Sequence, residues 1–453
     1  MNAHRHRVAV VGGGLAGITA ALRCADAGCD VVLLESRPWL GGLTHSFRRT
    51  GIWVDNGQHV FMRCCTSYRV LLDRLGTSGL VTVQDRLDIP VRSARDHRTA
   101  RLRRVGLPAP LHLAPALARY RWLPPAERVR LVRAVQALGR VDRHDPRTDQ
   151  TSFAEWLAER GQSDRAVETI WDLIGVATLN ARAPDASLAL AATVFQLGLL
   201  DNASAADLGW SRVPLRRLHG DAAATALADA GANVQTHAKA TRVIRSDGRW
   251  TVRAGDVDHD ADDVVLAVPP RNAERLLPDG AVRMPPGWGD ALGGSPIVNV
   301  HVVYDRVVLT EPFVAVVDGS LQWVFDRTEA SGLRHGQYVA ASLSAADTIV
   351  DWPVARLRER YLPQIEALLN PSRTATVRDF FVTRERDATF RPAPGSARLR
   401  PAMTALDGLH LAGAWTATGW PATMESAVRS GDAAAARVLE RRPISRAERE
   451  AVA

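Results

Sequence analysis

The stretch Arg7–Leu22, RVAVVGGGLAGITAAL, decides the fold of this chain. It reads as an apolar strand that runs into spaced glycines and then into a helix of small residues. In this pattern Gly12 permits a tight turn, Gly14 lets the backbone approach a pyrophosphate, and Gly17 lets the helix pack closely on the strand. The first N–H groups of such a helix face the phosphates. Spaced glycines also occur in ordinary structural turns, so the flanking sequence must separate the two readings.

The sequence after this helix supports nucleotide binding. A second strand, VVLL, follows, and Glu35 stands eighteen residues after Gly17. A carboxylate at this place accepts hydrogen bonds from the hydroxyls of a ribose. Because strand, helix and acid occur in the required order, the pattern predicts a Rossmann-type dinucleotide site. The predicted site comprises Gly12, Gly14, Leu15, Ala16, Gly17, Glu35, Ser36 and Arg37.

A second informative segment lies near the other end of the chain, Leu409–Gly431, LHLAGAWTATGWPATMESAVRSG. It reads as a short apolar strand, a turn rich in glycine, tryptophan and threonine, and a helix that we expect to begin at Pro421. A helix start carries partial positive charge, and the small residues before it let another molecule approach the backbone. An ordinary strand-to-helix turn is the alternative. Together the two ends predict one ligand held between them.

The composition indicates a globular protein with room for two lobes. The chain has 453 residues, of which 46% are hydrophobic and 23% are charged. No run of eighteen apolar residues occurs, and the longest candidate, Ala186–Leu200, is short and carries Gln196. We therefore expect no membrane-spanning helix.

The four cysteines have neither metal-site nor disulfide-framework spacing. They are Cys24, Cys29, Cys64 and Cys65. This usage predicts reduced thiols in a cytoplasmic protein without a metal site. We interpret the adjacent pair at 64 and 65 as packing, with redox chemistry as the alternative.

Residues 92–147 carry the chain's excess positive charge. The formal net charge is +8, and this segment holds fourteen arginines against four acidic residues. Apolar stretches, LPAPLHLAPALARYRWL and ERVRLVRAVQALG, lie among the arginines. This pattern predicts a surface that lies on anionic lipid, with the protein attached peripherally to the inner face of the cell membrane. A solvated arginine-rich helix face is the alternative. No recognised nucleic-acid-binding fold accompanies the charge, so no nucleic-acid partner is expected.

Strand and helix patterns divide the chain into two discontinuous lobes. They predict a mostly helical region over 80–215, strands over 230–270, an antiparallel sheet with one covered face over 295–350, a helix near 353–369 and a strand over 377–390. The predicted fold is α/β, with a Rossmann-like cofactor lobe made of 1–80, 212–275 and 375–440. The predicted substrate lobe, of antiparallel sheet and helices, comprises 81–211 and 276–374.

Several motifs together resemble a known superfamily. They are VVGGGLAGITAAL, the GG-x-x-x-SF run at 41–47, VDNGQHV at 54–60, LNARAPDASLAL at 179–190, RVPL at 212–215, VVLAVPP at 264–270, QWVFDR at 322–327 and LAGAWTATGWPATMESAVRSG at 411–431. The pattern resembles the FAD-containing amine oxidases and phytoene desaturases, and within them the hydroxysqualene dehydroxylases. The resemblance runs from residue 7 to 431.

The resemblance implies non-covalently held FAD and further cofactor residues. Beyond the Rossmann fingerprint, they are Gly41, Gly42, Leu43, Gly57, Gln58, His59, Ala240, Gly413, Ala414, Thr423 and Met424. Two positions depart from the family pattern. Leu43 stands where relatives commonly carry arginine, which removes a countercharge to phosphate, and Ala414 replaces an acidic residue, which removes a hydrogen bond to the cofactor.

The resemblance also implies a reaction, the reductive removal of an allylic hydroxyl from hydroxysqualene to give squalene in hopanoid synthesis. The substrate partner would be an apolar C30 isoprenoid, and the electron donor is not identified. Such a site needs a proton donor near the hydroxyl and aromatic faces near a cation. We predict His59 as the acid and Trp415 and Trp420 as aromatic walls; a structural role for the histidine and packing for the tryptophans are the alternatives.

Other functions fit the same resemblance. A carotenoid-type desaturase would use the same fold on an apolar polyene and run the flavin in the oxidising direction. A flavin-free lipid carrier is disfavoured by the intact fingerprint. Amine oxidation is disfavoured because amine oxidases of this fold use a lysine beside the flavin ring, whereas the sole lysine, Lys239, is expected beside the adenine. Asp326 and Arg327 could form a polar contact at the pocket rim or a buried salt bridge.

Overall fold

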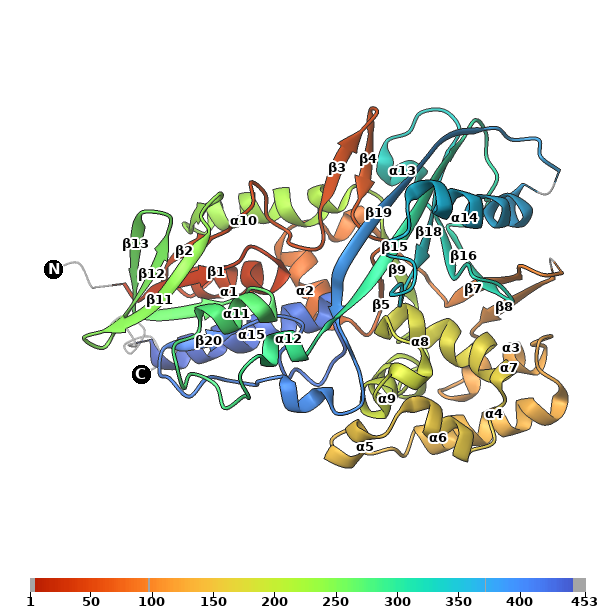
Figure 1. Ribbon diagram of the computed structural model, residues 1–453, viewed down its shortest axis with the longest axis horizontal. Coiled ribbons are helices and arrows are strands. Elements are labelled where there is room, and N and C mark those ends of the chain that lie inside the picture. The colour runs from red at the N-terminus through yellow and green to blue at the C-terminus, as the bar shows by residue number, and fades with distance from the viewer. Residues whose placement is uncertain (1–4, 97, 371, 443–453) are drawn as a thin grey trace.

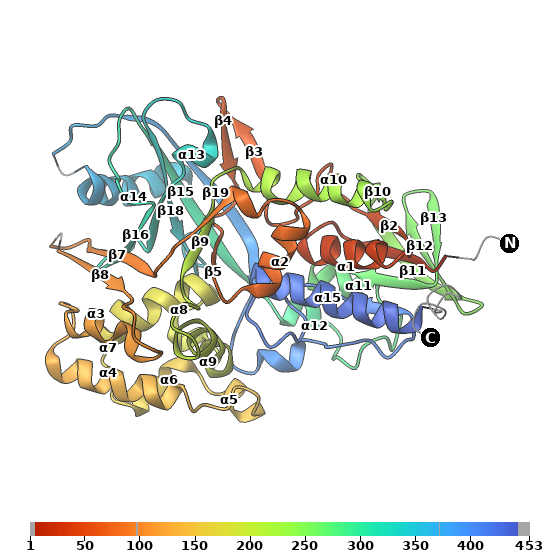
Figure 2. The same cartoon turned by 180° about the vertical axis from the view of Figure 1, so that it is seen from behind.

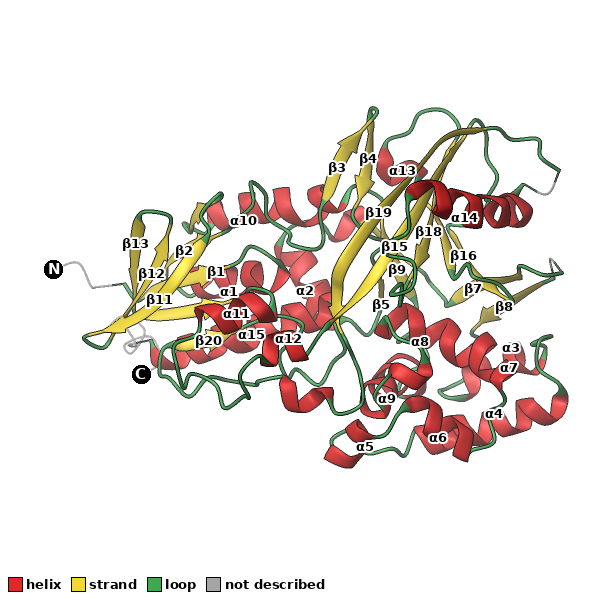
Figure 3. Cartoon of the chain, viewed as in Figure 1, coloured by secondary structure: helices red, strands yellow, loops and turns green. Residues whose placement is uncertain are grey.

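The computed structural model describes residues 5–96, 98–370 and 372–442. Figure 1 shows two lobes placed side by side along the long axis of the molecule. One lobe is built on a parallel sheet and the other on a mixed sheet with a group of helices beneath it. Figure 3 shows that most helices of the second lobe gather on one side of this mixed sheet.

The parallel sheet has five strands in the order β10-β2-β1-β14-β20. Their bounds are β10 (Asn233–Gln235), β2 (Asp30–Leu34), β1 (Arg7–Val11), β14 (Asp263–Leu266) and β20 (Leu409–Leu411). Each neighbouring pair is parallel. Strands from both ends of the chain therefore share one sheet, and this arrangement positions the cofactor segments of both ends at the same edge.

Helices cover one face of this sheet and an antiparallel meander covers the other. The helices are α1 (Leu15–Asp26), α2 (Thr66–Arg74), α10 (Ala222–Asp229) and α15 (Met424–Arg441), as Figure 2 shows from behind. The meander is β11 (Ala240–Ser246), β12 (Arg249–Ala254) and β13 (Val257–Ala261). In β1, Val8 and Val10 pack with the helices, whereas Ala9 and Val11 pack with the meander around buried Trp250. A strand buried on both faces explains its continuous apolar run.

The mixed sheet of the second lobe has seven strands in the order β19-β15-β18-β17-β16-β7-β8. Their bounds are β19 (Val377–Phe390), β15 (Gly294–Tyr304), β18 (Gln337–Leu343), β17 (Trp323–Asp326), β16 (Phe313–Val317), β7 (Asp88–Ser93) and β8 (Thr99–Arg103). All pairs are antiparallel except β7 with β16. The long pair β15 and β19 continues from this sheet to the parallel-sheet lobe (Figure 1).

The alternation of side chains in β15 separates two environments. Val298, Val300 and Val302 pack with α14 (Val354–Leu369) on one face of the sheet. On the opposite face, Ile297 and Asn299 border a cavity between the lobes. The expected antiparallel sheet over 295–350 and the expected helix near 353–369 are both confirmed.

The remaining elements join the two sheets or form the helical part of the second lobe. Short strands are β3 (Ser46–Arg49) with β4 (Ile52–Asp55), and β5 (Val60–Met62) with β9 (Leu208–Ser211) and β6 (Val81–Val83). The helices are α3 (Ala114–Ala118), α4 (Pro125–Leu138), α5 (Pro146–Gln150), α6 (Phe153–Glu159), α7 (Asp164–Ala166), α8 (Asp172–Leu179), α9 (Leu188–Phe195), α11 (Pro270–Leu276), α12 (Trp288–Ala291) and α13 (Thr328–Ser331). None of the helices within the described ranges is both long and apolar enough to cross a membrane.

Three predicted boundaries need correction. The region 80–215 is not mostly helical from its start, because β7 and β8 form one edge of the mixed sheet. The boundary at 375 is wrong for β19, which pairs along its length with β15 and is an edge strand of the mixed sheet. The last helix does not begin at Pro421. It begins at Met424, because Thr423 provides the N-cap by accepting a hydrogen bond from the Ser426 N–H.

Candidate functional site

A continuous cavity of ≈ 1080 Å³ lies between the two lobes. At one end it is bordered by the glycine turn after β1, the end of β2 and the turn before α15. At the other end it is bordered by apolar side chains of the helical region. It is therefore large enough for a dinucleotide together with part of a second ligand, since single-ligand pockets occupy about 300–1,000 Å³.

Nearly all predicted site residues border this one cavity. They are Gly12, Gly14, Leu15, Ala16, Glu35, Ser36, Arg37, Gly41, Gly42, Leu43, Gly57, Gln58, His59, Ala240, Gly413, Ala414, Trp415, Trp420, Thr423 and Met424. Gly17 does not border it. A side chain on Gly17 would meet the carbonyl oxygen of Gly12 at 1.9 Å, so this glycine allows α1 to pack on the turn. The fold thus brings together segments from both ends of the chain.

Glu35 fixes the glycine turn to the end of β2. Its buried carboxylate accepts hydrogen bonds from the N–H groups of Gly13 and Arg37, both at 2.7 Å, and from the Ser36 hydroxyl at 3.1 Å. Each carboxylate oxygen can accept more than one hydrogen bond, so the group can also bind a ribose. Its contact with Gly13 is an additional structural role.

The glycine turns leave room for backbone to approach a ligand. At Gly42 the φ angle is +56°, and a Cβ would lie 2.9 Å from the Cα of Gly14. At Gly12 a Cβ would lie 2.4 Å from the Ala267 carbonyl oxygen. Helices α1 and α15 both follow strands of the parallel sheet, so both begin at its carboxyl edge beside the cavity. Two helix N-termini at one site favour a pyrophosphate.

The cofactor end also carries positive charge, although Leu43 contributes none. Arg37, Lys239, Arg271 and Arg275 border the cavity there. A second indication that a ligand belongs here is Gln58, whose buried side-chain amide has no hydrogen-bond partner among the described residues on either its nitrogen or its oxygen. Buried amides normally have partners, so a ligand bound beside Gln58 would satisfy them. The residues present therefore fit an FAD.

Arg400 organises the turn that precedes α15. Its buried guanidinium donates to the carbonyl oxygens of Trp415 at 3.2 Å, Thr416 at 2.7 Å and Trp420 at 2.7 Å. Burial lowers the pKa of Arg400 to about 10, so it stays charged at neutral pH. Sequence reasoning missed this residue because it lies outside the glycine-rich motif whose carbonyl groups it collects.

The two predicted aromatic walls have clear packing contacts. The Trp415 indole N–H donates to the Val268 carbonyl oxygen at 2.9 Å, and its ring lies 5.3 Å from that of Trp288. The Arg429 guanidinium lies 5.0 Å from the centre of the Trp420 ring. Both tryptophans still border the cavity. These contacts favour the alternative that the two tryptophans serve in packing. Their role as aromatic walls beside a substrate cation stays a prediction.

Polar side chains are concentrated where the cofactor end meets the apolar end. Asn299 is fully buried, its Nδ2 donates to the Asn56 carbonyl oxygen at 3.5 Å, and its Oδ1 has no partner in the described part of the chain. His59 lies nearby in the sequence, with Nδ1 3.2 Å from the Gly57 carbonyl oxygen. Gln58 and Asn299 thus offer unused hydrogen-bonding groups to this junction.

The pKa values at the junction bear on proton transfer. Burial lowers the pKa of His59 below its ordinary value, although the Gly57 carbonyl acts in the opposite direction. A neutral imidazole is a weak acid, so the predicted role of His59 as proton donor is not favoured by its surroundings. Burial raises the pKa of Glu385 on β19, with Arg37 opposing the shift and Asp387 adding to it. Glu385 therefore holds its proton to higher pH than an exposed glutamate.

Asn299 and Glu385 were missed at the sequence level. Asn299 could have been noticed because it is a polar residue inside the apolar strand IVNVHVVY. Side chains alternate between the two faces of a strand, so Asn299 shares a face with Ile297. Glu385 lies in VTRERDATF among many charged residues, and nothing in that segment distinguishes it. Within the described ranges, no group of histidine, cysteine or acidic side chains could hold a metal.

Arg327 forms a buried salt bridge, but its partner is Asp55 and not the neighbouring Asp326. Arg327 donates to Asp55 at 2.6 Å, and both side chains are buried. Asp326 instead accepts from Thr328 and, at 2.8 Å, from Gln337. The salt-bridge alternative is therefore correct for Arg327, but the pair joins the VDNGQHV and QWVFDR motifs and does not form a contact at the rim.

The second end of the cavity is apolar. Its walls come from the mixed sheet and from the helices beneath it, including Ile89, Leu102, Ile170, Ile174, Phe195, Trp323 and Phe325. Such a surface accommodates a hydrocarbon chain and offers it few hydrogen-bonding groups.

Comparison with known proteins supports the resemblance. Residues 15–439 match the family described as flavin containing amine oxidoreductase. Hydroxysqualene dehydroxylase of Rhodopseudomonas palustris is 29% identical, over 95% of this chain and 98% of the relative. The enzyme of the same name from Sinorhizobium fredii is 28% identical, over 94% and 97%. Zeta-carotene desaturase of Arabidopsis thaliana is 24% identical, over 96% and 85%.

Solved structures with the same fold cover almost the whole chain. A putrescine oxidase triple mutant superposes with a TM-score of 0.73 at 19% identity, covering 96% of this chain and 99% of that chain. Cyclohexylamine oxidase from Brevibacterium oxydans gives a TM-score of 0.72 at 19% identity, with the same coverage. At this identity the two structures establish the fold alone.

Proposed function

The chain belongs to the flavin-containing amine oxidoreductase family and is an FAD-dependent oxidoreductase, and we propose that within this family it removes the allylic hydroxyl of hydroxysqualene to give squalene. The relatives named hydroxysqualene dehydroxylase, which match along nearly their full length, support this reaction. We also propose that it serves hopanoid synthesis.

The observation that carries the proposal is the division of the cavity. A hydroxylated C30 isoprenoid is a long hydrocarbon with a single polar group. The cavity offers a long apolar arm, and it offers unused polar groups of Gln58 and Asn299 where this arm meets the cofactor end. A substrate with one hydroxyl would therefore be oriented by placing that hydroxyl at the junction.

The proposed reaction replaces a C–O bond with a C–H bond. The hydroxyl leaves as water after taking up a proton, and the carbon receives a hydride. Reduced FAD, when bound, supplies that hydride, and a two-electron reductant must restore it. The protein supplies orientation through Asn299 and Gln58 and excludes water with the apolar arm. Glu385 is the better proton source at the cavity wall, because burial keeps its carboxyl protonated to higher pH.

A carotenoid-type desaturase is the second candidate, and the match to zeta-carotene desaturase favours it. A polyene would occupy the same apolar arm, but it has no hydroxyl to engage Asn299. Amine oxidation is not proposed, since Lys239 borders the cavity next to Ala240 at the cofactor end, and Asn299 occupies the polar junction.

A single-turnover experiment tests the proposal. The FAD-loaded protein is reduced under anaerobic conditions and mixed with hydroxysqualene, and we expect squalene to form while the flavin absorbance of the oxidised state returns. In a parallel sample, oxidised protein is mixed with a carotenoid precursor. Desaturation of the polyene without squalene formation would contradict the proposed dehydroxylation and show that the protein is a desaturase.

A further inference from the structure

The segment that follows β8, residues 105–138, has an inner and an outer apolar face; we call it the cap segment. Its inner face borders the cavity through Pro110, Leu113, Leu117, Leu131, Val135 and Leu138. Its outer face exposes Leu107, Leu111, Val129 and Val132, each between 46% and 56% exposed. Leucines and valines that are exposed together on the outer face of such a segment indicate an interaction surface.

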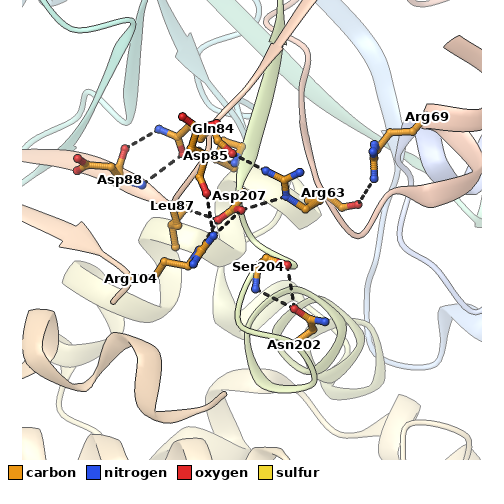
Figure 4. A network of polar contacts seen from close by, with 11 residues as sticks. Arg63, Arg69, Gln84, Asp85, Leu87, Asp88, Arg104, Asn202, Ser204 and Asp207 are labelled. Atoms are coloured by element: carbon orange, nitrogen blue, oxygen red, sulfur yellow. Dashed lines mark hydrogen bonds and ion pairs between the residues drawn. The ribbon is translucent and has the colours of Figure 1, made fainter. Parts of the chain in front are cut away.

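Hydrogen bonds at its start and in its middle hold the cap segment against the rest of the protein. At its start, the buried Asp207 carboxylate accepts from Arg104 at 2.6 Å, from Arg63 at 3.0 Å and from the Leu87 N–H at 2.7 Å, as Figure 4 shows. In its middle, the Tyr120 hydroxyl donates to the Thr169 carbonyl oxygen at 2.6 Å. Because the backbone is fixed on both sides of the exposed leucines, their exposure is a property of the fold.

Arginines lie beside these apolar side chains. A pocket of ≈ 320 Å³ between β8 and α3 is bordered by Arg101, Arg103, Arg119 and Arg121. Arg101 is neutralised by Asp88 and Glu311, both at 2.8 Å. Arg119 and Arg121 are exposed and form no ion pair with any residue that the structure describes. The surface therefore combines protruding hydrocarbon with free positive charge.

We propose that the cap segment is a docking surface for a bilayer that contains anionic phospholipid. Leu107 and Leu111 enter the boundary between headgroups and acyl chains, and Arg119 and Arg121 bind lipid phosphates. Charge complementarity selects this occupant, because a nucleic acid would leave the leucines exposed to water and an apolar protein partner would leave the arginines without countercharge.

The same geometry provides a path for the substrate, and this step rests on the proposed function. Pro110 borders the cavity and is itself exposed next to Leu111. Pro110 is therefore part of both the cavity wall and the molecular surface. A C30 isoprenoid dissolved in the bilayer can therefore pass under the cap segment without entering water.

Sedimentation with vesicles tests the docking surface. The full-length FAD-loaded protein is mixed with vesicles of phosphatidylcholine alone or of phosphatidylcholine with phosphatidylglycerol. We expect binding to the anionic vesicles, weakened roughly tenfold or more by the pair L107S and L111S. The pair R119Q and R121Q should weaken binding roughly 30-fold and should reduce its dependence on phosphatidylglycerol.

Matched controls separate docking from general effects of exposed side chains. The pair V257S and V307S, at 55% and 62% exposed positions elsewhere, and the pair R334Q and R398Q, at exposed arginines, should bind as the unaltered protein does. Equal weakening in the controls, or no vesicle binding at all, overturns the proposal. Because sedimentation involves no turnover, its outcome is independent of whether hydroxysqualene is the substrate.

Discussion

Arg327 and Asp55 form a buried ion pair that joins the two lobes. Arg327 Nη2 donates to Asp55 Oδ2 at 2.6 Å, while Asp55 Oδ1 accepts from the Ser46 hydroxyl at 2.6 Å and from the Leu215 N–H at 3.1 Å. One carboxylate thus holds β3, the RVPL segment and the chain after β17. These are three of the motifs that carry the family resemblance, and the pair explains why they belong together.

Removing one partner of this pair should be costly. We expect Arg327→Leu to lower the free energy of unfolding by about 3–5 kcal/mol, because it leaves the Asp55 charge buried without its partner. Denaturant unfolding of the FAD-loaded protein measures this. The matched control is Arg386→Leu, which breaks the exposed pair with Asp351 and should change stability by less than about 1 kcal/mol. Similar losses in both variants would show that burial of the pair does not matter.

Gly42→Ala should impair cofactor binding. The new Cβ would lie 2.9 Å from Gly14 at a φ angle of +56°, so both glycine turns must shift. We expect a backbone penalty of about 1–3 kcal/mol and a lower flavin content after purification. Gly28→Ala, at a φ angle of +81° where the new Cβ would have no atom of the described residues within 4 Å, is the control for backbone strain alone. Full flavin content in the Gly42 variant would refute a close approach of ligand and backbone.

Asn299→Val should reduce turnover without loss of flavin. The substitution keeps the shape of the strand but removes the unused amide oxygen that we assign to the substrate hydroxyl. Losing this hydrogen bond should lower kcat/KM by roughly ten- to a hundredfold, as expected for an unsatisfied polar partner. Val300→Ala, on the opposite face of β15, should lower stability and leave turnover per bound flavin intact. If Val300→Ala lowers turnover per bound flavin as much as Asn299→Val does, the loss is due to altered packing and not to the missing hydrogen bond.

The pH dependence of turnover should identify the acid. Because burial raises the pKa of Glu385, a reaction that uses its proton proceeds at low pH and slows as pH rises through that raised pKa. We expect Glu385→Gln to abolish this limb of the profile, whereas His59→Gln should retain it. If the limb disappears with His59→Gln instead, the original prediction of His59 as acid is correct.

Buried histidines should limit stability in acid. Burial lowers the pKa of His301 and of His219 to about 3, so both are neutral in the folded protein. In the unfolded chain they take up protons near pH 6.5, and stability therefore falls as pH drops from about 6.5 towards 3. At pH 5 each contributes a loss of about 2 kcal/mol relative to pH 7. Unfolding in urea at both pH values should show a smaller difference for His301→Gln, and an unchanged difference would contradict this.

Much of the cofactor half could be predicted from sequence because local patterns specify it. The glycine turn, Glu35 and the tail motif each lie next to a strand and a helix start, and parallel strands bring their carboxyl ends to one edge. The boundary at 375 failed because pairing between β15 and β19 joins residues far apart in sequence, which no local pattern encodes.

The junction was harder to predict for the same reason. Arg400, Asn299 and Glu385 owe their importance to burial and to neighbours that come from distant segments. The position of Arg327 illustrates the limit: its charge suggested a salt bridge, but its sequence neighbour Asp326 was the wrong partner.

The continuous pair of β15 and β19, which extends from one sheet to the other lobe, restricts how the molecule can open (Figure 1). Two long paired strands shared by both halves should resist bending, so we expect little hinge opening between the halves. Flavin should then be captured while the chain is folding, and stripped protein should regain its colour only when it is refolded from denaturant in the presence of FAD.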